Sequence, residues 1–398
     1  MSATPILRFC DKDGHPFPEW ESMFIGDYLT KKSIKQVPTD EAPLMSFVAH
    51  RGVVEKGDKY DRSHLVKSKD KKYKRTDLND FIYSSNNLDV GSIGLNKHGS
   101  AVISEVYEIF SINDAANPDF ISEVIQMPET IDKIIRFRQG CLYGQYKIYP
   151  EDFLDVEINM PSKEEQDKVA AFLSLYDQKI EKQMAKVEAL ELRRKGLLQQ
   201  IFSQEIRFKA DDGSEFPDWD TVIIEEAFDS ISDKNHPDKT VLTIIQGQGT
   251  IPREESDRNI SYNKASIPTY KLVKENDFIM HLRSFEGGLE IATREGIVSP
   301  AYTILRNKID LVPEFYRYYF RSSSFIVEKL TGITEGIRDG RSINMDDFWL
   351  LEIPYPSIPE QRKIGRFMDL INKQIQIEKD KLEAIKLVKK GLLQQMFV

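Results

Sequence analysis

The sequence predicts an α+β fold in which two pseudo-twofold-related α/β domains are separated by two long antiparallel coiled-coil helices. The first observation is a stretch of 42 residues, Pro161 to Phe202, that returns without a gap as Pro356 to Phe397 with 19 positions identical. The second is that the segment Leu7 to Trp20 also returns, as Ile206 to Trp219. The third is the coiled-coil spacing of apolar residues inside the longer repeat. The chain is therefore a tandem duplication of a variable region followed by a long helix.

Length and composition describe a globular protein with two domains. The 398 residues suffice for two cores of ordinary size. The chain is 40% hydrophobic and 30% charged and has no apolar run of about 18 residues, so we expect no membrane span. The amino-terminal residues lack the basic and apolar pattern of a signal peptide. Only Cys10 and Cys141 are present, far apart, which favours a reducing cytoplasm.

The repeat sets the domain boundaries that we expect. Residues 1–160 and 206–355 form the two variable domains. Residues 161–205 and 356–398 form the two helical segments.

Within each variable domain the pattern is mixed α and β. Runs of β-branched and aromatic residues from Ala101 to Phe110 and from Ile297 to Leu305, each bounded by turn residues, predict strands. A helix is expected to start after Pro118 and another after Pro313, because proline suits the first helical turn and helical apolar spacing follows.

The start of each long helix carries the pattern of a capping box. Ser162 is followed by Glu165, and Ser357 by Glu360. In a capping box the serine oxygen accepts a hydrogen bond from the backbone three residues on, and the glutamate accepts one from the serine N–H. We therefore expect both serines to be helix caps.

Apolar residues in both long helices alternate by four and three positions, which is the spacing of a coiled-coil seam. In the first helix the apolar seam positions are Val169, Leu173, Tyr176, Ile180, Val187, Leu190, Leu197 and Ile201, with Gln183 and Arg194 as polar breaks. In the second they are Ile364, Met368, Ile371, Ile375, Leu382, Ile385, Leu392 and Met396, with Glu378 and Lys389 at the same places. Matching seams predict that the helices pack on each other. Each helix would be about 60 Å long, more than one domain of this size covers, so it should reach between two bodies.

Gly196 and Gly391 occupy the same position near the end of each helix, where glycine costs up to about 1 kcal/mol relative to alanine. Two interpretations are open. Either a close helix contact or a bend requires the glycine, or the helix simply ends near it.

No catalytic constellation stands out, so we expect neither a catalytic residue nor a metal ligand in this chain. The sequence has no phosphate-binding glycine loop, no Pro-Pro-aromatic tetrapeptide of adenine methyltransferases and no His-Glu-x-x-His motif. Pro237-Asp238 is compatible with the start of a nuclease carboxylate cluster, although Pro-Asp is common in turns. A nuclease is therefore the alternative among enzymes.

The net charge of −9 argues against a uniformly basic nucleic-acid coat, but one segment is strongly basic. Between Arg51 and Arg75 ten lysines and arginines stand against four acids. Such a segment attracts phosphate regardless of base sequence; the alternative is a solvated lysine-rich loop. The candidate phosphate contacts are Lys67, Lys69, Lys71, Lys72, Lys74 and Arg75, with Arg253, Arg258 and Lys271 in the corresponding stretch of the second half.

Polar loops in both halves are candidates for contacts with bases, because arginine and asparagine bond guanine and adenine edges in the major groove. The candidates are Asn86, Asn87 and Arg138 in the first half and Arg283, Ser284, Arg338 and Arg341 in the second. For each residue alone, a surface position without DNA contact is the alternative.

Together these features resemble a known family. Pro-Ser-x-x-Glu-Gln opens a long helix that closes with Lys-Gly-Leu-Leu-Gln-Gln-x-Phe, twice, and Arg-Phe…Phe-Pro-x-Trp opens each variable half. Over nearly the whole chain this arrangement resembles the specificity subunit of type I restriction–modification systems. The resemblance implies a non-catalytic DNA-binding subunit. Each variable half would be a target-recognition domain for one half of a split, asymmetric site, and the helices would set the gap.

The resemblance also implies partners and cofactors. The partners would be double-stranded DNA, two methyltransferase subunits that carry S-adenosylmethionine and methylate adenine at N6, and two restriction subunits that can join with ATP and Mg. This chain would bind no cofactor itself. Because the sequence stops at Val398, any contact that closes its two ends must involve Met1 to Arg8 and the last two residues. The rival from another class is a coiled-coil scaffold that joins two protein-binding domains.

Overall fold

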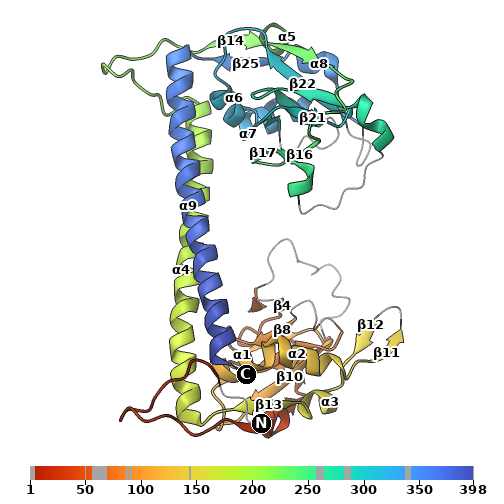
Figure 1. The fold of residues 1–398 in the computed structure, drawn as a ribbon, viewed down its shortest axis with the longest axis vertical. Coiled ribbons are helices and arrows are strands. Elements are labelled where there is room, and N and C mark those ends of the chain that lie inside the picture. Colours follow the sequence, from red (N-terminus) through yellow and green to blue (C-terminus); the bar gives the residue numbers. More distant parts are fainter. Residues whose placement is uncertain are drawn as a thin grey trace. The chain divides into compact units, whose positions relative to one another are not determined.

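The computed structural model of the chain describes residues 5–49, 51–55, 70–86, 88, 92–142, 145–256, 264–281, 288–336 and 342–397. The chain divides into two compact units, one of Met1–Lys182 and Leu382–Val398 and the other of Gln183–Lys381. Each long helix is shared between the units rather than forming a segment of its own. Helix α4 (Lys163–Phe202) starts in the first unit and ends in the second, and α9 (Ile358–Met396) runs in the opposite order (Figure 1). None of the described helices has the length and apolar composition that a bilayer crossing requires.

The first unit is built on antiparallel sheets, one with the strand order β2-β10-β7-β8 and one with the order β3-β6-β9. Its strands are β1 (Glu21–Phe24), β2 (Leu29–Lys32), β3 (Lys35–Gln36), β4 (Ser46–Val48), β5 (Gly52–Val54), β6 (Tyr73–Thr76), β7 (Phe81–Ser84), β8 (Ile93–Leu95), β9 (Ala101–Ile103), β10 (Tyr107–Ile112), β11 (Gln139–Leu142), β12 (Gln145–Lys147) and β13 (Glu157–Met160). Its short helices are α1 (Pro118–Gln126), α2 (Pro128–Ile135) and α3 (Pro150–Leu154).

The second unit has a sheet with the order β15-β22-β19-β20 and four two-stranded pairings in the part that is described. Its strands are β14 (Asp220–Ile223), β15 (Phe228–Ile231), β16 (Leu242–Ile245), β17 (Gly249–Pro252), β18 (Lys271–Val273), β19 (Phe278–His281), β20 (Glu290–Ile291), β21 (Gly296–Val298), β22 (Tyr302–Asn307), β23 (Thr334–Glu335), β24 (Ser342–Ile343) and β25 (Glu352–Tyr355). Its short helices are α5 (Ile224–Ala227), α6 (Pro313–Tyr319), α7 (Ser323–Phe325) and α8 (Met345–Trp349).

The two units repeat one topology. Strand β10 pairs with β2 and β7 in the first unit, and β22 pairs with β15 and β19 in the second. Strand β1 pairs with β13, and β14 with β25, so the beginning and the end of each variable region lie together. The predicted α+β class with repeated domains and long helices is therefore confirmed.

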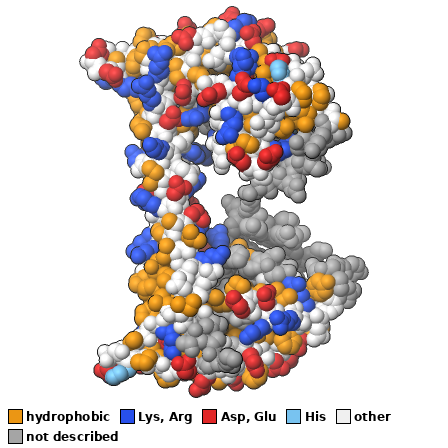
Figure 2. Space-filling view, viewed as in Figure 1, with side chains coloured by type: hydrophobic (Ala, Val, Ile, Leu, Met, Phe, Trp, Pro, Cys, Tyr) orange, Lys and Arg blue, Asp and Glu red, His pale blue; other side chains and the backbone are white. Residues whose placement is uncertain are grey.

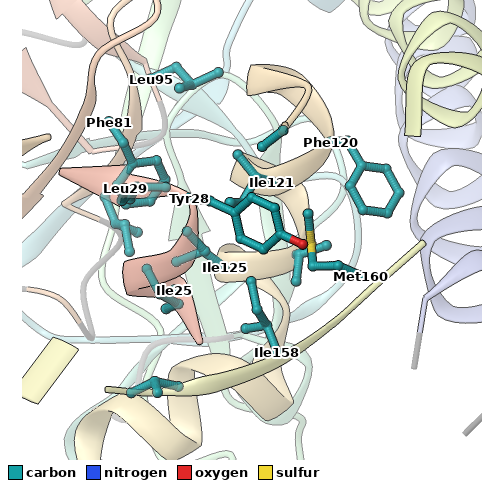
Figure 3. Close-up of a cluster of buried hydrophobic side chains, with 14 of the residues drawn as sticks. Ile25, Tyr28, Leu29, Phe81, Leu95, Phe120, Ile121, Ile125, Ile158 and Met160 are labelled. Carbon is teal, nitrogen blue, oxygen red and sulfur yellow. The ribbon is translucent and has the colours of Figure 1, made fainter. Parts of the chain in front are cut away.

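Equivalent aromatic residues form the cores of the two units. In the first unit Phe81 from β7 and Phe120 from α1 are fully buried in a cluster that also includes Met160 from β13 (Figure 3). In the second unit Phe278 and Phe315 take the same places and are also fully buried. Burial of side chains of this size dominates the hydrophobic stabilisation of a core.

The secondary structure predicted for the variable regions is right in kind, but the strands are shorter than predicted. The run Ala101 to Phe110 contains β9 and the first part of β10, and the run Ile297 to Leu305 contains most of β21 and β22. A serine-led turn interrupts each run, and the apolar residues on both sides hide it in the sequence. The predicted helix starts are confirmed, since Pro118 and Pro313 are the first residues of α1 and α6.

Helices α4 and α9 pack in an antiparallel manner within each unit. Every seam position named above is buried or half-buried. In the first unit Lys389 Nζ, near the end of α9, lies 2.7 Å from Asp177 Oδ1 in the first half of α4. In the second unit Arg194 Nη1, near the end of α4, donates to Asn372 Oδ1 at 3.0 Å in the first half of α9.

The other polar break brings equivalent positions of the repeat together. Gln183 Nε2 donates to Glu378 Oε2 at 2.7 Å and to the Glu378 backbone oxygen at 2.8 Å. Lys186 and Lys381 also form ion pairs with the Glu378 carboxylate, at 3.0 and 2.9 Å. Each polar break in the seam thus has at least one hydrogen-bond partner, as buried polar groups usually do, although Arg194 Nε is itself buried without one.

The capping box predicted for α4 is wrong in its second half. The Ser162 hydroxyl accepts from the Glu165 N–H at 3.4 Å, as a cap does. The Glu165 carboxylate, however, accepts from Arg8 Nε at 3.0 Å and from Arg8 Nη2 at 2.8 Å. The physical reason is that a guanidinium offers two charge-assisted bonds, whereas a serine N–H offers one neutral bond.

The capping box predicted for α9 is wrong in both halves, because neither Ser357 nor Glu360 caps the helix. Glu360, which is fully buried, accepts from Arg207 Nε at 3.0 Å and from Nη2 at 3.2 Å. The Ser357 hydroxyl is buried without a hydrogen-bond partner. The glutamate of each repeat therefore anchors the segment that opens each variable region.

The glutamine of each repeat anchors a second segment. Gln166 Oε1 accepts from the Asn117 N–H at 2.8 Å, and Gln361 Oε1 accepts from the Val312 N–H at 2.9 Å. Each side-chain amide also donates to the carbonyl of the proline five residues earlier, at 3.0 and 2.7 Å. Since Asn117 and Val312 directly precede α1 and α6, the glutamines fix the starts of these helices.

The first unit contains both ends of the chain (Figure 1). The Leu7 N–H donates to the Gln395 carbonyl at 2.8 Å. The ring of Phe397 packs against Phe120 and Trp20, with ring centres 5.2 and 6.2 Å apart. The two ends thus do make contact, but the expected partners are right only in part, because Leu7 pairs with Gln395 and Phe397 packs on Trp20 and Phe120.

In the second unit the equivalent backbone hydrogen bond joins residues that lie close together in the chain. The Ile206 N–H donates to the Gln200 carbonyl at 3.1 Å. The Phe202 ring packs against Phe315 and Tyr319 at 5.6 and 5.3 Å. In the second unit the end of α4 is joined covalently to the segment that opens the variable region. In the first unit the end of α9 and the equivalent segment are joined by non-covalent contacts. We call this connection the junction of each unit.

The two helical glycines are not contact points. A Cβ built at Gly196 or at Gly391 would have no atom within 4 Å outside its immediate helix. The interpretation as a close helix contact is therefore wrong. Both helices end a few residues later, at Phe202 and Met396.

Candidate nucleic-acid interface

The basic residues around β6 differ in their exposure and in their contacts within the domain. Lys71 and Lys72 are exposed, and Lys71 Nζ lies 5.3 Å from the centre of the Tyr73 ring. The Lys74 side chain is only 13% exposed, and its Nζ donates to a backbone carbonyl of β10 at 2.7 Å and to Glu108 Oε2 at 3.0 Å. Lys74 is therefore neutralised inside the domain, whereas Lys71 and Lys72 can face phosphate.

Arg75 is also bound within the first unit. Its Nε and Nη2 each donate to Asp77 Oδ1 at 3.1 Å, and its Nη1 donates to Gln36 Oε1 at 3.3 Å. Burial disfavours the ionised Asp77 carboxyl, but bonds from Lys32, Arg75 and Ser100 outweigh it and lower the pKa of Asp77 to about 2. This network holds the turn between β6 and β7.

In the second unit Lys271 repeats the role of Lys74. Its Nζ donates to the Tyr302 carbonyl at 2.7 Å, the position equivalent to the β10 carbonyl that Lys74 binds. Burial, with a smaller contribution from Lys234, lowers the pKa of Lys271. Arg253 is half-buried beside Thr243, with Nε and Oγ1 3.4 Å apart.

Two more candidates are half-buried at the edges of the first unit. The Asn86 side-chain oxygen accepts from the Ser85 hydroxyl at 3.0 Å in the turn after β7. Arg138 lies just before β11, with its guanidinium 5.6 Å from the centre of the Tyr146 ring. The remaining candidates lie outside the described residues: Lys67, Lys69, Asn87, Arg258, Arg283, Ser284, Arg338 and Arg341.

Two β-hairpins that were not singled out from the sequence occupy the same place in the two units. They are β4–β5 and β16–β17, the second of which is visible in Figure 1. Val48 pairs with Gly52 in the first hairpin, and Ile245 pairs with Gly249 in the second. The sequence signal was a glycine at a spacing of 197 residues, between the 199 and 195 residues that join the matches before and after it.

The long helices expose leucines that are identical in the two copies of the repeat. Leu175 and its equivalent Leu370 are 53% and 66% exposed, and Leu192 and its equivalent Leu387 are both 70% exposed. Figure 2 shows hydrophobic and basic side chains on the surface of the helices. Isolated exposed leucines are ordinary, but these four are set apart because the same exposed positions hold leucine in both copies.

The described residues do not assemble a metal or catalytic cluster. Among them, no group of three or more histidine, cysteine, aspartate or glutamate side chains could hold a metal ion. Asp238, the residue proposed for a nuclease site, is exposed. The structure therefore gives no support to the nuclease alternative.

Two repeated α+β domains on a shared pair of long helices, each with an equivalent β-hairpin, define the class to which this chain belongs. The family model of the type I restriction modification DNA specificity domain matches residues 18–191 and 263–387. The chain is a member of this family and a specificity subunit of the type I restriction–modification class.

Relatives support this assignment at low sequence identity. The chain is 23% identical to the type I restriction enzyme MjaVIII specificity subunit of Methanocaldococcus jannaschii, over 97% of this chain and 94% of that protein. It is 24% identical to the same organism's protein named "Putative type I restriction enzyme MjaX specificity subunit", over 63% of this chain and only 60% of that protein's length.

Solved structures share the fold. The S subunit of the type I restriction–modification system from M. genitalium aligns over 100% of this chain and 99% of its own length, with a TM-score of 0.56 and 14% identity. A chain from a structural study of complex assembly and conformational transition of the type I system aligns over 96% and 99%, with a TM-score of 0.53 and 16% identity. These likenesses concern the fold alone.

Proposed function

We propose that this chain recognises a bipartite, asymmetric DNA site and directs adenine-N6 methylation there, and cleavage when restriction subunits are present. The observation that carries the proposal is that one framework is built twice while the surfaces around it differ. Arg8–Glu165 and Arg207–Glu360 make the same buried pair in the two units. The residues around the hairpins differ, so the two domains would recognise different half-sites.

In this proposal the chain contributes binding and no chemistry. Exposed lysines such as Lys71 and Lys72 would attract phosphate, and polar tips would contact bases. S-adenosylmethionine would belong to the methyltransferase subunits, and ATP and Mg to the restriction subunits. The complex would act in the cytoplasm.

The methylation proposal is tested by methylome sequencing of cells that carry this chain with its methyltransferase. We expect N6-methyladenine at one split motif, lost when the gene for this chain is deleted. Methylation that persists unchanged after deletion would refute the proposal. Binding of the complex to DNA that weakens steeply with salt would separate it from the coiled-coil scaffold alternative, which never meets nucleic acid.

We further propose that the exposed leucines repeated on α4 and α9 bind two methyltransferase subunits in equivalent ways. An aspartate at Leu192 or Leu387 would place a charge in such an apolar contact. Each single variant should then retain one methyltransferase subunit and the double variant none, measured by native mass spectrometry. Full retention by the double variant would exclude this surface, and Leu350→Asp, at an exposed position in the turn after α8, is the control.

A further inference from the structure

The two β-hairpins close with the same turn. The Arg51 N–H donates to the Val48 carbonyl at 3.0 Å, and the Gln248 N–H donates to the Ile245 carbonyl at 3.0 Å. Because the strand pairing next to the turn is also the same, Arg51 and Gln248 occupy one position of a common turn. The residue type at this position therefore distinguishes the two domains.

A glycine holds each hairpin against its neighbouring strand. Gly52 and Gly249 have φ values of +71° and +84°, which favour glycine. A Cβ at Gly52 would lie 2.8 Å from the Leu95 carbonyl oxygen, and one at Gly249 would lie 2.7 Å from that of Ile291. These are equivalent contacts with β8 and β20. Each turn is thus fixed on the sheet by a contact that no other residue could make without a shift of the backbone.

The second hairpin has an additional support below its tip. Glu290 on β20 is buried, and its Oε1 accepts from the Gly247 N–H at 2.7 Å. The same oxygen lies 3.2 Å from Arg321 Nε. Burial raises the pKa of Glu290, while Arg321 and the N–H groups of Gly247 and Gly249 act in the opposite direction. A buried carboxylate is costly, and here it fixes an exposed turn instead of filling the core.

The side chains at these tips have the chemistry that reads bases. Arg51 and Gln248 are exposed. In the major groove, which admits a two-stranded β-ribbon, arginine bonds the O6 and N7 atoms of guanine, and glutamine bonds N6 and N7 of adenine. Base readout requires a side chain on a rigid support, since a misplaced donor loses most of its discrimination. An exposed arginine or glutamine on a turn is ordinary; the repeated glycine contact sets these two apart, and the buried carboxylate adds a second support under Gln248 alone.

We propose that the two hairpin tips are equivalent base-reading elements, with Arg51 reading a guanine in one half-site and Gln248 reading an adenine in the other. The inference rests on the proposed function, because it assumes that both domains contact DNA. It goes beyond that function by assigning one position in each domain and the base that it selects.

The test exchanges the two side chains in the complete complex with the methyltransferase. Arg51→Gln should change or relax one base position in one half-site only, and Gln248→Arg one position in the other half-site only, as measured by methylome sequencing. Discrimination at that position should fall about tenfold or more, the factor that roughly 1.4 kcal/mol of lost preference produces. Glu290→Ala should relax the position read by Gln248 and leave the other half-site unchanged.

Control variants distinguish a failure of this inference from a failure of the proposed function. Lys12→Gln and Gln374→Arg change exposed residues away from the hairpins and should leave the motif as it is. Co-purification with the methyltransferase shows that each variant is folded. A wild-type split motif that stays unchanged in both Arg51→Gln and Gln248→Arg would overturn the inference alone, as would both variants acting on the same half-site. Absence of a split motif in the wild type would instead refute the proposed function.

Discussion

The two units keep some contacts identical and let others diverge, and the difference follows burial. The pairs Arg8–Glu165 and Arg207–Glu360 have carboxylates that are 1% and 0% exposed, and both residue types are the same in the two units. A buried charge cannot lose its partner without a large cost, so such a pair changes only as a whole.

The polar contacts at the ends of the helix seam have diverged. In the first unit Lys389 binds the carboxylates of Glu123 and Asp177 at 2.9 and 2.7 Å. In the second unit Arg194 takes the place of Lys389 and binds the amide of Asn372, which in turn donates to the Tyr318 hydroxyl at 2.7 Å. These contacts are partly exposed, and water can satisfy a group that has lost its partner. The two units therefore keep the same residues where both charged partners depend on each other in a buried site, and they differ where the contacts are partly exposed.

The largest expected effect comes from the junction that only one unit makes non-covalently. Phe397→Ala removes a buried ring from the first unit and should cost about 4 kcal/mol. Phe202→Ala should cost the second unit less, because that ring is half-buried and its segment stays attached by the chain. Hydrogen exchange measured on residues of each unit checks this. An equal loss of protection in both units from either substitution would contradict the assignment of the two junctions.

The next effect concerns the contact that both units share. Arg8→Ala leaves Glu165 as a buried charge without its partner and should destabilise the first unit by about 3 kcal/mol. Arg207→Ala should do the same to the second unit through Glu360. Denaturant unfolding followed by hydrogen exchange in each unit measures both.

A matched control tests the cause. Lys209→Ala breaks an exposed ion pair with Glu215 and should change stability by less than about 1 kcal/mol. Adding Glu165→Gln to Arg8→Ala should recover part of the loss, because the uncompensated charge is gone. If the double variant were no better than Arg8→Ala, the loss would come from packing and not from charge.

The smallest expected effect is pH-dependent and lies at the centre of the seam. Hydrogen bonds from Gln183, then Lys381 and Lys186, lower the pKa of Glu378 to about 2 from an ordinary value of 4.5. Because the folded pKa lies below the unfolded one, the stabilisation is complete above about pH 4.5 and is lost as the pH falls toward 2. Glu378→Gln should therefore be less stable than the wild type at pH 7, and the difference should vanish near pH 2.

Thermal unfolding at a series of pH values checks this prediction. Glu383→Gln is the control, because Glu383 is exposed and pairs only with Lys386 one turn along α9 in the described structure. The difference in stability between Glu383→Gln and the wild type should vary little with pH. A constant difference between Glu378→Gln and the wild type from pH 7 to pH 2 would show that the charge of Glu378 has no role.

The parts of the fold that could be predicted are those that leave a regular pattern or repeat in the sequence. The seam of α4 and α9, the starts of α1 and α6 and the duplication itself follow from spacings that can be counted along the chain. The pair Arg8–Glu165 could not be found this way, since 157 residues separate its members and a helix cap offered a simpler role for the glutamate. Repetition of Arg, Glu and Gln in both halves marked them as important without telling what they bind.

The candidate site was predicted less well for a related reason. Lys74 and Lys271 were predicted to contact phosphate because a lysine side chain is usually solvated. In the folded domains both side chains instead donate a hydrogen bond to a backbone carbonyl of a nearby strand. Strand pairing is non-local, so sequence spacing does not show which side of the sheet is closed. The hairpin tips were missed because a single exposed arginine or glutamine carries no pattern of its own.

The composition of the units has a consequence for synthesis. The second unit, Gln183–Lys381, is one continuous stretch, whereas the first needs residues 382–398 to complete its core around Trp20 and Phe120. Domains fold as their residues leave the ribosome, at about 5–20 residues per second. The domain that is translated first must therefore wait about 10–40 seconds, the time for roughly 200 further residues, before its core is closed. During that interval Trp20 and Phe120 lack the cover that Phe397 provides, and such transiently exposed apolar surface is prone to aggregate.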